Sequence, residues 1–290
     1  MGGGAWSFND YTKYSCSVGR SVTVDGQLDL ADGYSAQELF KSRRLQPELN
    51  PYKVIRQCCD TSEHPNTIPV ILALDVTGSM GGGAVEVAKK LNEVMTNIYD
   101  RVKDVEFLVM GIGDLSYDYA PIQASQFESD IRIAEQLDKI YFEGGGGGNS
   151  FESYTGAWYF GLKHTDLDCW KRGKKGIIIT MGDEPLNPYL PQNALQRVFG
   201  DTVQADVETA ELYKSALEKF DIYHLAVDDR ETSYAYYEDR IAKTFGEYLD
   251  KNHLRTVKLN NISSTIVDIV SNASSAATAG VVNNSEGISW

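Results

Sequence analysis

The segment 68–83 joins an apolar run to a cluster of side-chain oxygens. The run 68–74 is rich in β-branched residues and leads into Asp75, Thr77 and Ser79, which glycines follow. An apolar run of this length, bounded by proline and glycine, is typical of a fully buried parallel strand. One carboxylate and two hydroxyls spaced two residues apart are hard oxygen ligands, which suit Mg²⁺, Mn²⁺ or Ca²⁺. The segment therefore indicates one part of a cation site.

Two more aspartates come after apolar runs. Asp114 follows the run 106–113, and Asp183 follows the run 175–181. A single aspartate in a loop is unremarkable, since Asp favours turns and helix N-termini. Aspartates that end several parallel strands, however, meet at one edge of the sheet, where they repel each other unless a cation neutralises them. The spacing therefore predicts a divalent cation at this edge.

A run of five glycines, 144–148, leads into Asn149, Phe151 and Glu152. The run follows a predicted helix and contains no lysine, so a phosphate-binding P-loop is a poor match. A flexible linker is one interpretation. The other is a metal-binding loop, because the run opens directly into a carboxylate and a further helix.

The elements that must position these side chains alternate along the chain. We expect strands at 68–74, 106–113, 120–127, 175–181, 221–227 and 256–259. We expect helices at 84–102, 129–142, 152–164, 190–198, 207–220, 234–249 and 263–271. Strands joined by crossover helices predict an α/β fold, doubly wound around a mostly parallel central sheet with helices on both faces.

The two ends of the chain are less regular. Residues 1–67 show a strand-like piece at 21–24 and a helix at 35–44 that Ser35 and Glu38 begin with a capping box. We expect 1–67 to be an extension packed on a main domain of residues 68–271. The tail 272–290, rich in Ala, Ser and Asn, is expected to be mobile.

Composition narrows the function classes. The chain has 41 acidic and 27 basic residues, a formal charge of −14 and a pI near 4.7, which disfavours binding to nucleic acid or an anionic membrane. No signal peptide or membrane-spanning stretch is evident. The four cysteines lack a C-x-x-C spacing, so reduced thiols in a cytoplasmic protein are the simplest interpretation, and a disulfide-stabilised secreted adhesin is the alternative.

The pattern Asp75-x-Thr77-x-Ser79 after a buried strand resembles the Asp-x-Ser/Thr-x-Ser signature of von Willebrand factor A (vWA) domains and integrin I domains. The resemblance extends over about 68–271 and implies a Rossmann-like fold with a metal-ion-dependent adhesion site (MIDAS). It implies hydroxyl ligands from Thr77 and Ser79 and a carboxylate ligand from Glu152. Asp75 and Asp183 would bind the Mg²⁺ directly or through waters. In this family an Asp or Glu of the binding partner fills the open position.

The resemblance also implies a second cation. Asp114 matches an integrin β aspartate that serves an adjacent ion, and with Asn149, Glu152 and the Phe151 carbonyl it would hold Ca²⁺. In this sequence Asn149 replaces the usual aspartate and Phe151 replaces proline. Bacterial vWA proteins without signal peptides often resemble adaptors of MoxR-type AAA+ ATPases, so such an ATPase is a partner by analogy.

Two functions remain open from the sequence. One is a non-enzymatic, metal-dependent protein-binding module. The other is a Mg²⁺- or Mn²⁺-dependent hydrolase of phosphoesters, in which the metal acts as a Lewis acid. The hydrolase needs a general base beside the metal, and the sequence offers Asp114, Asp118 or Glu184 for this role.

Overall fold

The computed structural model describes residues 3–145, 148–230 and 232–279. At its centre is a six-stranded sheet with the order β10-β9-β6-β2-β3-β4. The strands are β2 (Ile68–Asp75), β3 (Val105–Ile112), β4 (Ile122–Ala124), β6 (Gly176–Gly182), β9 (Phe220–Val227) and β10 (Leu254–Val257). All neighbours in this sheet run parallel except β4, which pairs antiparallel with β3 at the edge. The predicted α/β class with a mostly parallel sheet is confirmed.

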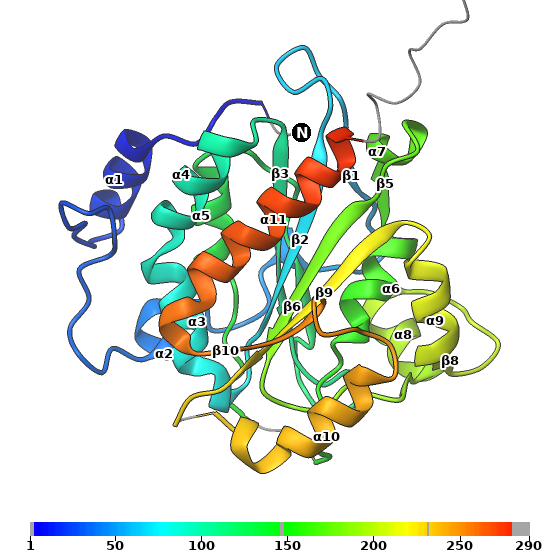
Figure 1. The fold of residues 1–290 in the computed structure, drawn as a ribbon. Coiled ribbons are helices and arrows are strands. Elements are labelled where there is room, and N and C mark those ends of the chain that lie inside the picture. The colour runs from blue at the N-terminus through cyan, green and yellow to red at the C-terminus, as the bar shows by residue number, and fades with distance from the viewer. Residues whose placement is uncertain (1–2, 146–147, 231, 280–290) are drawn as a thin grey trace, which may run out of the picture.

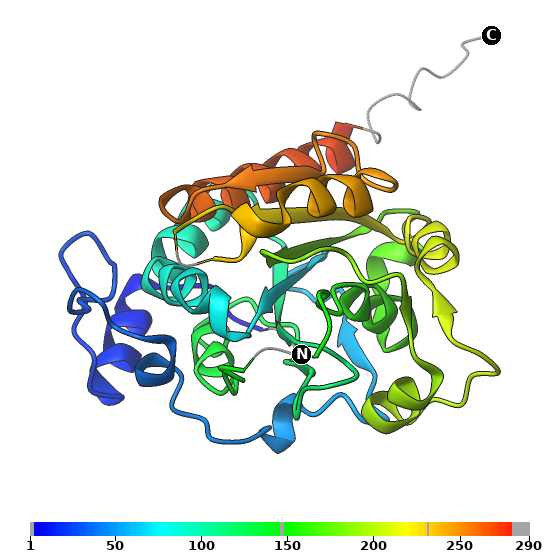
Figure 2. The same cartoon turned by 90° about the horizontal axis from the view of Figure 1, so that it is seen from below.

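Helices cover both faces of the sheet (Figures 1 and 2). One face carries α3 (Gly81–Lys89), α4 (Leu91–Arg101), α5 (Arg132–Leu137) and α11 (Ile262–Ala279). The other carries α6 (Thr155–Lys163), α8 (Gln192–Phe199), α9 (Thr209–Ala216) and α10 (Tyr234–Gly246). The period of two in β2 explains the two cores, since Leu72 and Leu74 enter the first and Ile71 and Ala73 enter the second. Because both faces are buried, the strand has to be apolar throughout.

The strand order reverses direction at β2. From β2 the chain proceeds to β3 on one side, whereas β6 lies on the other side of β2 and leads outward to β9. The loops after β2 and β6 therefore diverge, and open α/β sheets bind ligands in the crevice at such a point. Leu74 of β2 is level with Met181 of β6, so Asp75 and Asp183 leave the sheet at the same edge.

Among the predicted helices that differ from the structure, two do so for identifiable reasons. The predicted helix 84–102 is two helices, α3 and α4, because the Leu28 N–H donates to the Lys89 carbonyl and Lys90 leaves helical geometry. The predicted helix 35–44 is only one turn, α2 (Ala36–Leu39), although its capping box is confirmed. It ends at Phe40, which turns into extended backbone and stacks on Phe142 in the core.

Several short elements were not predicted. They are α1 (Phe8–Ser17), η1 (Pro47–Leu49), η2 (Gly78–Met80), β5 (Thr165–Leu167), α7 (Asp168–Lys171), β7 (Tyr189–Leu190), β8 (Val207–Glu208) and η3 (Leu259–Asn261). The predicted strand 21–24 is an isolated bridge between Val22 and Leu28. β1 (Arg56–Cys58) pairs parallel with β5, away from the main sheet. Such pieces are too short to show a period.

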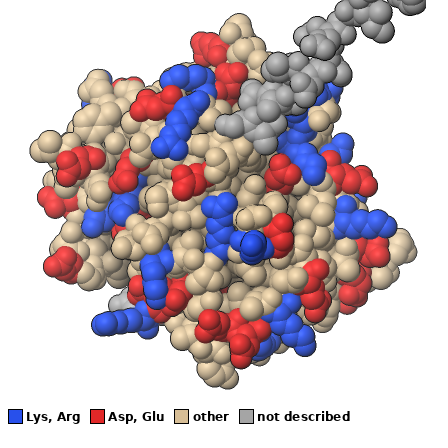
Figure 3. All heavy atoms as spheres, in the orientation of Figure 1, with Lys and Arg blue, Asp and Glu red and all other residues tan. Residues whose placement is uncertain are grey.

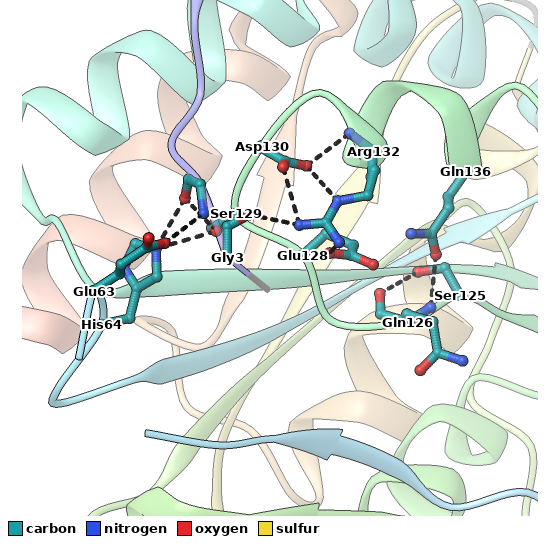
Figure 4. Close-up of polar contacts among 11 residues, drawn as sticks. Gly3, Glu63, His64, Ser125, Gln126, Glu128, Ser129, Asp130, Arg132 and Gln136 are labelled. Carbon is teal, nitrogen blue, oxygen red and sulfur yellow. Dashed lines mark hydrogen bonds and ion pairs between the residues drawn. The ribbon is translucent and has the colours of Figure 1, made fainter. Parts of the chain in front are cut away.

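Residues near the N-terminus are held to the domain by polar contacts (Figure 4). The Gly4 carbonyl accepts from the Ser129 hydroxyl (2.7 Å) and lies 2.9 Å from His64 Nε2. The Gly4 N–H donates to Glu63 at 2.9 Å, and Arg132 donates to the Gly3 carbonyl at 2.7 Å. Ser129 and His64 are buried, so the contacts fix this segment against the interior. The boundary at residue 67 stays a prediction.

The C-terminal helix is longer than predicted. α11 continues to Ala279 instead of ending at 271, so 272–279 are helical, and the rest of the predicted tail, 280–290, lies outside the described residues. All four cysteines are free. Within the described residues, no helix is long and apolar enough to cross a bilayer.

Candidate metal centre

Asp75 is the last residue of β2 and is completely buried. Its Oδ1 accepts hydrogen bonds from the Thr77 N–H (2.9 Å) and the Thr77 hydroxyl (2.6 Å), and its Oδ2 accepts one from the Tyr154 hydroxyl (2.8 Å). These three donors fix the carboxylate. The Thr77 hydroxyl donates its hydrogen bond to Asp75, so its oxygen lone pairs stay free to face a cation. Asp75 thus fixes the orientation of the Thr77 hydroxyl.

Ser79 and Asp183 lie on the two loops that diverge from the switch point. Ser79 is in η2 and is partly exposed, and its hydroxyl lies close enough to Asp183 to oppose the rise in the pKa of that carboxyl. Asp183 follows β6 and is fully buried. Its Oδ2 accepts from the Ser233 N–H at 2.5 Å, whereas its Oδ1 has no hydrogen-bond partner.

Glu152 comes from the loop between the glycine run and α6. A parallel bridge with Leu186 holds it beside the loop that follows β6. Only 2% of its surface is exposed, and its Oε2 has no hydrogen-bond partner. A buried acceptor without a partner costs roughly 1–3 kcal/mol, and more when it carries a charge. Together with Asp183 Oδ1, this oxygen is an unsatisfied acceptor at the sheet edge.

The carboxyl groups at this edge raise one another's pKa. Burial, followed by the charge of Asp183, raises the pKa of Asp75 to about 8. Burial also raises the pKa of Glu152 well above its ordinary value, and the charges of Asp75, Asp118, Glu184 and Asp114 add to the effect. Burial and neighbouring aspartates raise the pKa of Glu184 to about 7. A bound cation would remove this repulsion.

The residues present fit a divalent cation of the hard, oxygen-binding kind. Two hydroxyls (Thr77, Ser79) and one carboxylate (Glu152) are available as direct ligands, and Asp75 and Asp183 stand behind them. The described residues contain no group of three His, Cys, Asp or Glu side chains arranged as a metal cluster. The three carboxylates of the predicted set, Asp75, Asp183 and Glu152, do not form such a group, so the ligand set stays a proposal. The structure thus brings the five predicted residues to one edge.

The predicted ligands of a second cation are more dispersed. Asp114 Oδ1 accepts from the Ser116 N–H at 2.5 Å. Asn149 is exposed, and its Oδ1 accepts from the Phe151 N–H at 3.1 Å. The backbone N–H of Asp114 donates to Asp118 Oδ2 at 2.6 Å. The second Ca²⁺ and its ligands Asp114, Asn149 and Phe151 stay a prediction.

Sequence reasoning did not assign Tyr154 or Ser233 to the site. Tyr154 is fully buried and reaches Asp75 across the backbone of Gly182, where an added Cβ would lie 1.9 Å from the Tyr154 hydroxyl oxygen. Any larger residue at position 182 would therefore displace the tyrosine. The available signal was a glycine at the end of a buried strand, directly before Asp183. Ser233 acts through its backbone, which leaves no signal in the sequence.

Replacing Tyr154 with phenylalanine is expected to destabilise the protein by about 1–3 kcal/mol, because Asp75 loses a donor and the Glu184 N–H loses its acceptor. The pKa of Asp75 should rise further, since the tyrosine lowers it. Urea unfolding at pH 8 measures the loss. Tyr236→Phe, at an 83% exposed side chain, is the control and should change nothing. Equal stability of Tyr154→Phe and the parent would contradict the role given to this hydroxyl.

Comparison with known proteins adds little to this geometry. No protein-family model matches the sequence, and no curated protein matches it. Among solved structures, the pilus adhesin SpaC from Lactobacillus rhamnosus GG is 13% identical, with a TM-score of 0.46 over 87% of this chain. The vWF domain of the type V pili tip protein Mfa5 from Porphyromonas gingivalis is 11% identical, with a TM-score of 0.43 over 77% of this chain and 98% of that one.

A third similar structure is proximal thread matrix protein 1 from the mussel byssus, which is 14% identical with a TM-score of 0.43 over 74% of this chain and 49% of that one. The present chain spans only 35% of SpaC. At these identities and scores the fold class stands on the sheet topology of the chain itself.

Proposed function

We propose that this chain is a non-enzymatic protein-interaction module that binds Mg²⁺ at the edge where β2 and β6 end and, through that ion, a carboxylate of a partner protein. The observation that carries the proposal is the pair of buried carboxylate oxygens without partners, Glu152 Oε2 and Asp183 Oδ1, beside the oriented hydroxyl of Thr77. Mn²⁺ or Ca²⁺ would suit the same oxygens.

The proposed site favours a guest for a physical reason. Thr77 and Ser79 are neutral ligands, and Asp75 is engaged by three hydrogen-bond donors. A cation held by two hydroxyls and one carboxylate keeps much of its positive charge. Mg²⁺ also prefers six oxygens and exchanges waters for other oxygen ligands. An Asp or Glu of a partner is the protein ligand that best completes such a sphere, and the vWA resemblance implies the same.

Only the vWA resemblance indicates what kind of protein the partner is. An AAA+ ATPase of the MoxR type is the partner to examine first, and the proposal does not depend on it. What the site requires is an accessible acidic side chain on the partner, whatever the partner's fold.

A retention experiment tests the proposed function. The immobilised protein is exposed to a lysate of its source organism in Mg²⁺ and eluted with EDTA. Proteins that elute with EDTA are identified, purified and rebound to the parent, to Asp75→Ala and to Ser79→Ala. We expect rebinding in Mg²⁺ to the parent only. Rebinding of the same proteins to all three columns, with or without EDTA, would refute metal-dependent interaction.

One observation favours the hydrolase as a second candidate. Glu184 is half-buried beside the carboxylate cluster, and burial raises its pKa to about 7, which suits a general base at neutral pH. If this function is correct, the protein with Mn²⁺ hydrolyses generic phosphoesters, and Glu184→Gln removes the turnover. Absence of turnover above that of Glu152→Gln would eliminate the hydrolase and leave the interaction module.

A further inference from the structure

An arginine of α10 lies beside the cluster of carboxylates. Arg240, an exposed residue of α10, places its guanidinium 5.0 Å from the ring of Phe151 and 5.3 Å from the ring of Tyr237. Its Nη2 lies 3.5 Å from the carbonyl oxygen of Ser150. Ser150 and Phe151 directly precede Glu152. The guanidinium is therefore held against the loop that presents the carboxylate ligand.

The charge of Arg240 acts on the site without being neutralised there. It lowers the pKa of Glu184, against the larger effect of burial. No ion pair among the described residues includes Arg240, although other arginines have close acidic partners, such as Arg20 with Asp138 at 2.7 Å. On the face seen in Figure 3, basic and acidic side chains are intermixed. Rather than an acidic side chain, Arg240 contacts the faces of two aromatic rings. This cation–π arrangement orders the side chain and leaves its charge unpaired by any ion pair among the described residues.

A guanidinium so held is suited to bind a second acidic group. It has five N–H donors in a planar fork, which match the two oxygens of a carboxylate. A carboxylate already bound to the cation has at most one oxygen to offer, whereas a separate carboxylate offers both. A partner that approaches this edge also meets repulsion from Asp114, Asp118 and Glu184. Arg240 offsets part of this repulsion.

We propose that Arg240 is a second anchor for the guest, so that the preferred partner segment carries two acidic residues, one for the cation and one for the guanidinium. The inference rests on the proposed function, since the first acid needs the cation. It goes beyond that function by specifying the partner as an acidic pair. Removing Arg240 takes positive charge away from the site, so it should leave Mg²⁺ affinity unchanged or slightly increase it.

Synthetic peptides provide the test. The probes are a capped peptide with one aspartate and three of equal length with two aspartates, separated by zero, one or two glycines. They are titrated in Mg²⁺ against the parent, Arg240→Gln and Arg101→Gln, the last being a control at an exposed arginine at the end of α4. Calorimetry with Mg²⁺ alone is run on the same three proteins.

We expect the best two-aspartate peptide to bind the parent and Arg101→Gln about ten-fold more tightly than the one-aspartate peptide. The Arg240→Gln protein should bind the one-aspartate peptide as the parent does and should bind the two-aspartate peptide no more tightly than that. Equal affinity of both kinds of peptide for the parent would overturn the second anchor alone. The second anchor would also be overturned if Arg240→Gln lost affinity equally for the one-aspartate and the two-aspartate peptides. Failure of every peptide to bind the parent in Mg²⁺ would overturn the proposed function and this inference together.

Discussion

Replacing Glu152 with glutamine is expected to weaken Mg²⁺ binding at least about 100-fold and, at the same time, to make the metal-free protein more stable. The first effect follows because Glu152 is the one carboxylate proposed as a direct ligand, and even the loss of a residue that only supports a ligand weakens metal binding by about 10- to 100-fold. The second follows because Glu152 Oε2 is buried without a partner among other acids. The neutral amide removes that repulsion.

The sign of the stability change can be worked out from the pKa. Burial raises the pKa of Glu152 in the folded protein, so the unfolded chain releases this proton at lower pH than the folded chain does. The stability of the metal-free parent therefore falls as pH rises above the unfolded pKa. At pH 8, in EDTA, Glu152→Gln should be more stable by roughly 1–3 kcal/mol. Urea unfolding measures this gain, and calorimetry measures the Mg²⁺ affinity.

A matched control separates these effects from a general change of charge. Glu238→Gln removes one carboxylate from the exposed side of α10 and should alter neither property. If Glu152→Gln bound Mg²⁺ like the parent, the ligand role of Glu152 would be wrong. If it were less stable in EDTA, the view of this residue as an unsatisfied buried charge would be wrong.

Replacing Glu106 with glutamine is expected to stabilise the protein at pH 8 by about 2–3 kcal/mol and to have little effect near pH 4.5. Glu106 is the second residue of β3, at the sheet edge opposite the cation site, and is only 1% exposed. Neither of its carboxylate oxygens has a hydrogen-bond partner. Burial raises its pKa to about 7, which the Cys58 thiol and His64 oppose and Glu128 reinforces.

The raised pKa of Glu106 determines the pH range over which the stability of the parent changes. Below the unfolded pKa of about 4.3, both states hold the proton, so the ionisation of Glu106 does not change stability. Between that value and about 7 the unfolded chain ionises first, so parent stability declines with rising pH. Urea unfolding of Glu106→Gln and the parent from pH 4.5 to 8 in EDTA gives the difference. Glu218→Gln, on the surface, is the control. A difference that did not change with pH would contradict the burial argument.

Much of the fold could be predicted because the strands are buried on both faces. The strand predicted at 175–181 is Gly176–Gly182, and that predicted at 221–227 is Phe220–Val227. Their apolar runs leave little choice of structure. The break between α3 and α4 could not be predicted, because it depends on the N–H of Leu28, more than sixty residues away. Local patterns do not report such contacts.

The candidate site shows the same division. Asp75 and Asp183 could be placed together because the carboxyl ends of adjacent parallel strands share an edge. Tyr154 and Arg240 could not, because their roles depend on how α6 and α10 pack against loops distant in sequence. Asn149 was given a role by its place after the glycine run, and that role stays a prediction.

The most direct test of the cation site is a crystal structure of the protein grown in Mn²⁺, with the ion located by its anomalous scattering. We predict a peak in contact with the side-chain oxygens of Thr77, Ser79 and Glu152. The carboxylates of Asp75 and Asp183 should lie next to these three side chains. If crystals grown in saturating Mn²⁺ show no anomalous peak at this edge, the proposed cation site is wrong. A peak confined to Asp114 and Asp118 would contradict it equally.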